Sequence, residues 1–197
     1  MKHYFIFAAL VLVLAATPGT AAFAAGPQGS SAAAQKPTVP AVYDRLISSV
    51  EKEVVDAADA MPQDKFNFAP TGPGEFKGVR TYAMQIKHIA AVNYMVGASL
   101  LGEKPPVDIG NENGPADITS KADIMKYLKD SFAYAHKSAA GLSESNLLEQ
   151  VKAPWGDRPV TRLSLATIMI SHPYDHYGQM VEYLRMNSII PPASRGQ

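Results

Sequence analysis

The sequence contains no cysteine among its 197 residues. Disulfide bonds, thiolate nucleophiles, iron–sulfur clusters, cysteine-ligated zinc and covalently attached c-type haem are therefore excluded. A lipoprotein anchor on cysteine is excluded for the same reason. Because no disulfide can stabilise the fold, its stability must come from packing.

The chain also lacks an excess of charge of one sign and any long apolar run. Its 18 basic and 18 acidic residues balance, so bulk charge favours neither nucleic acid nor an acidic membrane as a partner. No apolar run reaches the roughly 20 residues of a membrane-spanning helix, so we expect no stable membrane insertion. Glycine-rich phosphate loops and the G-x-S-x-G motif of serine hydrolases are absent as well.

The N-terminal segment has the features of an export signal. A basic start is followed by an apolar stretch over residues 4–16 and by the small-residue motif Ala22-Phe23-Ala24. We therefore expect residues 1–24 to be a cleaved signal peptide and the mature protein to be periplasmic or extracellular. Residues 25–40 are small, polar and rich in turn formers, which predicts a flexible leader, and residues 41–194 are expected to form one domain.

Four segments carry apolar residues at helical spacing. They are residues 42–61, residues 81–101, a segment capped by Thr119 or Ser120 that stops near Gly141, and residues 161–188. The turn-rich link "APWGDRPVTR" between the last two could form a small hairpin, but no convincing run of strands is present. The predicted fold is all-α, a four-helix bundle with long inter-helix loops, for which a homodimer is plausible.

Two histidines four residues apart suggest a metal site on the last predicted helix. At this spacing the Cβ atoms of His172 and His176 lie about 5–6 Å apart on one face, so both rings can reach one ion. His88 lies on an apolar stretch of the second helix, where it is either a hydrogen-bonded core histidine or the third ligand. Surface positions for the pair remain an alternative, and His136 is expected at the surface or at its boundary.

The face that carries the pair continues with Gln179 and Tyr183, which we expect to line a pocket together with Asp175. The run from His172 to His176 resembles the inverted zincin motif H-x-x-E-H with Asp175 in place of the glutamate. Aspartate is one methylene shorter, so a protease is not favoured. Asp175, Glu182 and Tyr183 are the nearest candidates for a general base, and helical geometry makes neither acidic residue convincing.

A family resemblance joins these histidines. The segment "RTYAMQIKHIAAVNYMV" around His88 and the segment "HPYDHYGQMVEYLRMNSIIPP" resemble the DinB superfamily of four-helix-bundle metalloenzymes. That family pattern has a histidine in the second helix, then H-x-x-x-H, G-Q, L-R and a closing G-x-x-P-P, and the resemblance spans residues 42–194. It implies that His88, His172 and His176 hold a divalent metal ion, for which zinc, nickel and iron are all compatible with imidazole.

The resemblance also implies possible activities on an unidentified small molecule. Characterised DinB branches include thiol-dependent transferases and isomerases, so the ion is expected to activate a thiol or water for transfer or hydrolysis. Export favours water, because an exported protein does not meet a large pool of reduced thiol. Two alternatives stay open: a non-catalytic metal- or ligand-binding protein of the envelope or of a stress response, and a bundle without metal in which His88 pairs with Gln179 or Tyr183.

Three positions carry further expectations. Pro173 removes a backbone donor directly after His172, which predicts a kink or a restart of the helix there. Ser188 stands where the family usually has a helix-ending glycine, which suggests a different C-terminal cap. Trp155 is expected to be a local core plug under its linker.

Overall fold

The computed structural model describes residues 36–71 and 78–196. The predicted signal peptide and most of the predicted leader lie outside the described residues, so both stay predictions. Within the described ranges, no helix is long and apolar enough to cross a membrane.

Four α-helices make up most of the described chain, and an antiparallel pair of short strands precedes the last helix. The elements are α1 (Val39–Ala60), the short 3₁₀ helix η1 (Gln63–Lys65), α2 (Tyr82–Leu101), α3 (Lys121–Ala139), β1 (Gln150–Lys152), β2 (Pro159–Thr161), α4 (Arg162–Met186) and the 3₁₀ helix η2 (Pro192–Ser194). The predicted four-helix bundle is therefore confirmed. So is the small hairpin, in which Val151 pairs with Val160.

Each α-helix begins at a hydroxyl-bearing cap. The side chains of Thr38, Thr81, Ser120 and Thr161 accept hydrogen bonds from backbone N–H groups in the first turns of α1, α2, α3 and α4. The Ser120 hydroxyl also donates to the Asp123 carboxylate at 2.6 Å. These caps explain why the helix starts were readable from the sequence.

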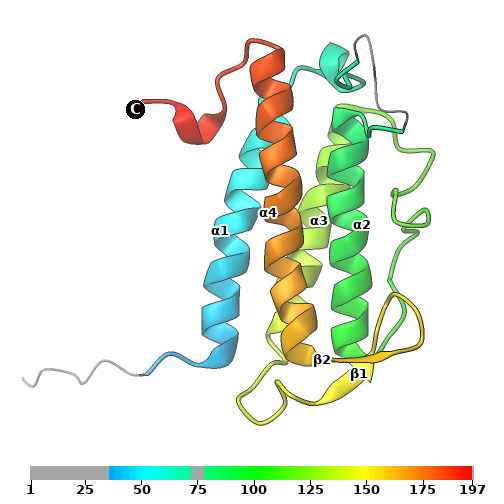
Figure 1. Cartoon of the computed structure of the whole chain (residues 1–197), viewed down its shortest axis with the longest axis vertical. Helices are drawn as coiled ribbons and strands as arrows, with labels where there is room; N and C mark the ends of the chain where they lie inside the picture. The colour runs from blue at the N-terminus through cyan, green and yellow to red at the C-terminus, as the bar shows by residue number, and fades with distance from the viewer. Residues whose placement is uncertain (1–35, 72–77, 197) are drawn as a thin grey trace, which may run out of the picture. The chain divides into compact units, whose positions relative to one another are not determined.

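The helices pack so that α2 and α4 are neighbours while α1 and α2 lie diagonally across the bundle. Helix α2 packs on α3 and α4, and α1 packs on the same two helices. Figure 1 shows α4 in front between α1 and α2, with α3 behind them. The face that α4 turns toward α2 is therefore inside the bundle, where a polar cluster must satisfy its own hydrogen bonds.

Helix α2 is buried along most of its length because two layers cover it. Fully buried side chains from all four helices, such as Ile47, Ile89, Phe132 and Leu184, form the core on its inner side. On its outer side lies the segment that joins α2 to α3, where Lys87 donates to the carbonyl oxygens of Pro115 and Ile118. A helix that is apolar almost all round is expected in such a position.

Three boundaries differ from the expectations. Helix α1 begins at Val39, inside the segment predicted as leader, because Thr38 caps it and Pro40 suits its first turn. Helix α4 runs continuously through Pro173, so of the predicted kink or restart the restart is wrong and the kink stays a prediction. Ser188 adopts φ 59°, the left-handed conformation that glycine favours, and the Ile189 N–H donates to the Leu184 carbonyl at 2.9 Å. The cap is therefore of the glycine type, and the expected different cap is wrong.

Candidate metal centre

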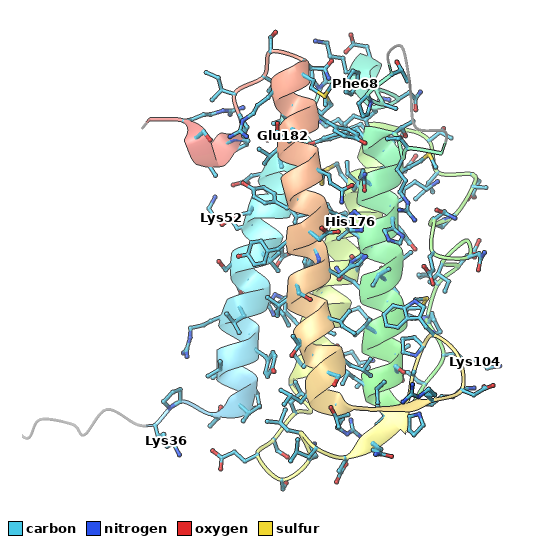
Figure 2. The ribbon with its side chains drawn as sticks, viewed as in Figure 1. Lys36, Lys52, Phe68, Lys104, His176 and Glu182 are labelled. Atoms are coloured by element: carbon cyan, nitrogen blue, oxygen red, sulfur yellow. The ribbon has the colours of Figure 1, made fainter. Side chains whose placement is uncertain are left out.

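Three histidine side chains from two helices converge between α2 and α4. His88 lies in α2, and His172 and His176 lie one turn apart on α4. Nε2 of His172 is 3.1 Å from Nε2 of His88 and 3.1 Å from Nε2 of His176. Figure 2 shows His176 on the side of α4 that faces α2. His88 and His176 are each only 6% exposed, so their nitrogens need partners inside the protein.

The other ring nitrogen of His88 is fixed by the backbone. Nδ1 of His88 lies 2.6 Å from the carbonyl oxygen of Glu112, which can only accept a hydrogen bond. Nδ1 therefore carries the proton in the neutral ring, and the lone pair stands on Nε2. Glu112 and its neighbour Asn111 both have positive φ, 70° and 49°, so the loop adopts an uncommon backbone conformation where it presents this carbonyl.

A chain of side-chain hydrogen bonds fixes His176 in the same tautomer. The Asp175 carboxylate accepts from Nε2 of Gln179 at 3.3 Å, and Oε1 of Gln179 accepts from Nε2 of Gln85 at 2.8 Å. Oε1 of Gln85 then accepts from Nδ1 of His176 at 2.7 Å. Because an ionised carboxylate can only accept, it sets the direction of every bond in this chain. Nε2 of His176 is left with its lone pair.

His172 occupies the middle of the cluster and is held differently. Its Nδ1 is buried and has no hydrogen-bond partner among residues 36–71 and 78–196. Its Nε2 faces two nitrogens that both present lone pairs, and a single proton on His172 can satisfy only one of them at a time. The three Nε2 atoms therefore have at most one proton among them, which is too few to hydrogen-bond both contacts of His172.

Burial lowers the pKa of all three histidines, so the cluster is neutral near pH 7. Burial, reinforced by the neighbouring rings of His176 and His88, lowers the pKa of His172 to about 3. Burial likewise lowers the pKa of His176 to about 4. The pKa of His88 is also lowered by burial, against a smaller opposing effect of its hydrogen bond to Glu112. Neutral imidazole is the form that binds metal.

The spacing and chemistry of the cluster fit a divalent ion. Two nitrogens that bind one ion at about 2.0–2.1 Å with an angle of about 90–110° stand about 3.0–3.4 Å apart. The observed 3.1 Å separations lie in this range. The three histidines are also a group of metal-ligating side chains whose donor atoms all lie within 4.8 Å of one another. Imidazole suits zinc, nickel and iron, so the donors do not select one metal.

A protein-family comparison covers the helices that carry this cluster. Residues 46–180 match the model of the DinB superfamily, which is more than half of the chain. The chain belongs to the DinB superfamily.

Solved structures similar to this DinB protein share its fold. YjoA, a DinB-like protein from Bacillus subtilis, is 15% identical with a TM-score of 0.56, over 75% of this chain and 92% of its own. A DinB-like protein from Bacillus cereus is 15% identical with a TM-score of 0.59, over 76% and 93%. YfiT from Bacillus subtilis, a probable metal-dependent hydrolase with an unusual four-helix bundle topology, is 14% identical with a TM-score of 0.56, over 76% and 88%. No curated protein matches the chain.

The residues expected to line a pocket have separate roles in the DinB bundle. Asp175 and Gln179 belong to the hydrogen-bond chain that orients His176. The Tyr183 hydroxyl instead donates to the carbonyl of Arg80 at 3.0 Å, and Glu182 pairs with Arg185 at 2.6 Å. The alternative in which His88 pairs with Gln179 or Tyr183 does not describe this structure, because His88 bonds to Glu112 and His172.

Two residues of the site were not predicted. Gln85 lies three positions before His88 on α2 and is only 2% exposed. A glutamine one turn from a candidate ligand in an otherwise apolar helix is a signal that could have been used. Glu112 contributes through its backbone carbonyl, which carries no residue-specific signal. Its side chain accepts from Trp155 Nε1 at 2.8 Å, and Trp155 is 40% exposed, so the expectation of a buried core plug is wrong.

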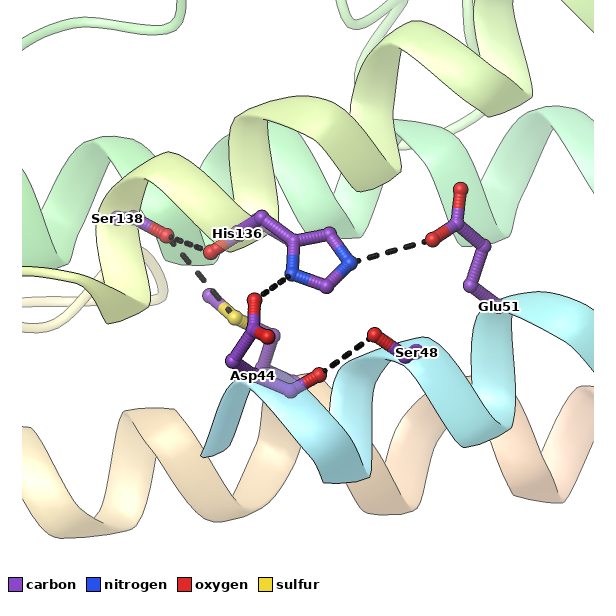
Figure 3. Close-up of polar contacts among 7 residues, drawn as sticks. Asp44, Ser48, Glu51, His136 and Ser138 are labelled. Carbon is purple, nitrogen blue, oxygen red and sulfur yellow. Dashed lines mark hydrogen bonds and ion pairs between the residues drawn. The ribbon is translucent and has the colours of Figure 1, made fainter. Parts of the chain in front are cut away.

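His136 lies outside the cluster and ties α1 to α3. Its Nδ1 is 2.6 Å from the Asp44 carboxylate, and its Nε2 is 3.2 Å from the Glu51 carboxylate. Figure 3 shows the ring between these two acids, with one nitrogen directed to each. The predicted boundary position is confirmed, because His136 is half-buried. Since the nitrogens point to different partners, they do not converge on a common point.

Proposed function

We propose that this DinB protein binds a divalent metal ion on His88, His172 and His176 and uses it to activate water for hydrolysis of a small molecule. The observation that carries the proposal is the convergence of the three Nε2 atoms, two of them with tautomers set by Glu112 and Gln85. A divalent ion on three neutral imidazoles keeps its full charge and supplies Lewis acidity toward water or a carbonyl group.

The protein's own part in this chemistry is to hold three neutral nitrogens in place before an ion arrives. Glu112 and Gln85 orient two of the rings, and such partners of metal-binding histidines commonly raise metal affinity tenfold to about a hundredfold. Burial keeps the rings unprotonated, so protons compete weakly with metal near pH 7. YfiT, which shares the fold, is described as a probable metal-dependent hydrolase, and this supports hydrolysis as the reaction class.

A second candidate function is metal or ligand binding without turnover in the cell envelope. The observation that favours it concerns the general base. Among residues 36–71 and 78–196, no carboxylate hydrogen-bonds to the three rings, and Asp175 reaches His176 only through Gln179 and Gln85. An enzyme that needs a protein base beside the ion would lack it here.

Export is the part of the proposal that rests on sequence alone. The basic, apolar and small-residue order of residues 1–24 supports cleavage after Ala24 and a periplasmic or extracellular location. Mass spectrometry of protein recovered from the periplasm or medium tests it. We expect a mature chain that starts at Ala25, and full-length protein retained in the cytoplasm would contradict export.

The test of function starts from protein made with its own signal and without a histidine tag. Elemental analysis is expected to find about one divalent ion per chain, and His88→Ala is expected to lose it, because one of three nitrogens is removed. Zinc-, nickel- and iron(II)-loaded samples are then assayed with 4-nitrophenyl esters. Bound metal without hydrolysis of any ester would favour the binding protein, and a metal-free wild type after loading would contradict metal binding in both functions.

A further inference from the structure

A cavity of about 510 Å³ lies at the end of α2 that is remote from its N-terminus. Helix α2, the segment after it and the β1–β2 hairpin form its walls, with Met95, Ser99, Ile109, Val151 and Pro154 among the lining residues. Small-molecule sites in proteins have volumes of about 300–1,000 Å³ and mainly apolar walls with few polar groups. The cavity has the size and the composition of such a site.

Two polar side chains of the wall, Ser99 and Glu103, are already engaged. The Glu103 carboxylate accepts from the Tyr134 hydroxyl at 2.7 Å and pairs with Lys137 at 3.6 Å. The Ser99 hydroxyl donates to the carbonyl of Lys152. The wall therefore offers no unpaired acid to attract a cation. Its one lysine, Lys152, is exposed, and the remaining side chains, mainly apolar, favour an apolar group.

Backbone geometry places the cavity close to the histidine cluster. Met95 and Ser99 follow His88 by seven and eleven residues, so all three positions lie on one face of α2. Seven residues of helix correspond to about 10 Å along its axis. The near end of the cavity, at Met95, is thus about two helical turns along α2 from His88, and the cavity extends farther away from it.

Two successive hydrogen bonds connect the residue next to the cavity wall to His88. Pro154 lines the cavity, and the next residue, Trp155, donates from Nε1 to Oε1 of Glu112. The backbone carbonyl of the same Glu112 accepts from Nδ1 of His88. The hairpin turn that closes the cavity is therefore two hydrogen bonds away from a ring of the cluster.

We propose that this cavity binds the apolar arm, aromatic or acyl, of an uncharged ester or amide substrate. The assignment of the ligand as a substrate rests on the proposed function, whereas binding in the cavity does not. Cavity volume, engaged polar groups and the Trp155–Glu112–His88 connection carry the inference. It predicts that esters with a larger apolar acyl group are preferred over acetates.

Binding is tested with 4-nitrophenyl hexyl ether, which resembles an ester substrate and cannot be hydrolysed. Trp155 is the only tryptophan in the chain, so its fluorescence reports on the hairpin turn beside the cavity. We expect saturable quenching in the wild type, both as purified and after removal of metal with a chelator. Val151→Phe, which places a ring in the cavity, is expected to weaken binding by about tenfold or more.

The control is Val160→Phe, because Val160 pairs with Val151 in the hairpin but is not among the residues of the cavity wall. Ala153→Leu is a second blocking variant in case Val151→Phe does not fold, and circular dichroism checks every variant. Absence of saturable quenching, or equal weakening by Val151→Phe and Val160→Phe, would overturn the proposal.

Esters then test the substrate class separately. With metal-loaded protein, kcat/KM for 4-nitrophenyl hexanoate relative to the acetate is expected to fall about tenfold in Val151→Phe and to be unchanged in Val160→Phe. If Val151→Phe leaves the hexanoate-to-acetate ratio of kcat/KM unchanged, the cavity does not bind the apolar arm of the substrate, and that part of the proposal is overturned. Saturable ether binding with no ester hydrolysis would count against the proposed function and would still support the cavity as a binding site.

Discussion

The bundle contains two histidine regions that use the same ring in opposite ways. Between α2 and α4, the Nε2 atoms of His88, His172 and His176 point at one another. Between α1 and α3, each nitrogen of His136 has its own carboxylate, from Asp44 and Glu51. In the first region the nitrogens face one another with too few protons for a hydrogen bond between every pair. In the second region each nitrogen faces a carboxylate oxygen that can accept a hydrogen bond.

The difference shows that the partner of each nitrogen, together with the burial of the ring, separates a candidate ligand site from a structural contact. Two carboxylates give each nitrogen of His136 its own partner, so this ring bridges two helices. A carbonyl or an amide oxygen on Nδ1 fixes the proton there, and burial keeps the ring neutral, so that its Nε2 is available to metal. The same comparison can be made in other helical bundles that lack a bound ion.

The largest difference is expected in metal content, between a variant that loses one ring of the three-histidine cluster and a variant that loses the ring of His136. We expect His176→Ala to lose essentially all bound metal, because two remaining nitrogens bind far more weakly than three, whereas His136→Ala should keep about one ion per chain. Elemental analysis after gel filtration measures both. Metal retained in His176→Ala, or lost in His136→Ala with the fold intact, would break the comparison.

Removal of the amide that orients His176 should have a smaller effect on metal. Gln85→Ala is expected to weaken metal binding by about tenfold to a hundredfold, because Nδ1 of His176 loses the acceptor that fixes its tautomer. Competition with a chromophoric chelator measures the affinity. The matched control is Asn93→Ala, since Asn93 is a buried polar residue of α2 that bonds instead to Ser131. Equal affinity of Gln85→Ala and wild type would refute the role given to this bond.

The folding stability of the metal-free protein should depend on pH because the rings of the three-histidine cluster are held neutral. His172 and His176 have folded-state pKa values of about 3 and about 4, below the unfolded value of about 6.5. The unfolded chain therefore binds protons that the folded chain does not as pH falls below about 6.5. Stability is fully present above that pH and should fall by about 2 kcal/mol per ring by pH 5.

Urea unfolding of metal-free protein at pH 7.5 and pH 5.0 measures this fall. Because other groups also titrate, the comparison is with His172→Phe, which removes one of the two rings. We expect a smaller loss of stability in the variant. An equal loss in both proteins would show that this ring is not held neutral by the fold.

The smallest effect is expected at His136, whose ring links α1 to α3. His136→Ala should lower the free energy of unfolding by about 1 kcal/mol, because hydrogen bonds to charged groups are lost while Asp44 stays largely solvated. Urea unfolding in low and high salt measures it, and salt should reduce the difference. A difference that salt does not change would mean that packing of the ring, rather than its two acids, links α1 to α3.

Much of the fold was accessible from the sequence because its signals are local. Capping hydroxyls such as Ser120 and Thr161 mark helix starts, and apolar spacing marks the buried faces. The start of α1 lies outside the predicted helix because the low apolar content around Thr38 favours a leader over a helix. Ser188 was misjudged because only its backbone conformation, and not its identity, defines the cap.

The ligand set was predictable only in part for the same reason. The spacing of His172 and His176 places both rings on one face of a helix, whereas the approach of His88 depends on α2 packing beside α4. Glu112 acts through a carbonyl that a left-handed loop presents, and no local pattern of residues predicts that loop. Helical periodicity therefore located the nitrogens, and tertiary structure alone identified what orients them.

The most direct test of the central claim is nitrogen-15 NMR of the histidine rings, recorded before and after addition of one equivalent of zinc. The account predicts that three rings bind zinc through Nε2, that His88 and His176 carry the proton on Nδ1, and that His136 is unchanged. Zinc bound through Nδ1 of His88 or His176, or three rings that do not respond to zinc, would contradict it.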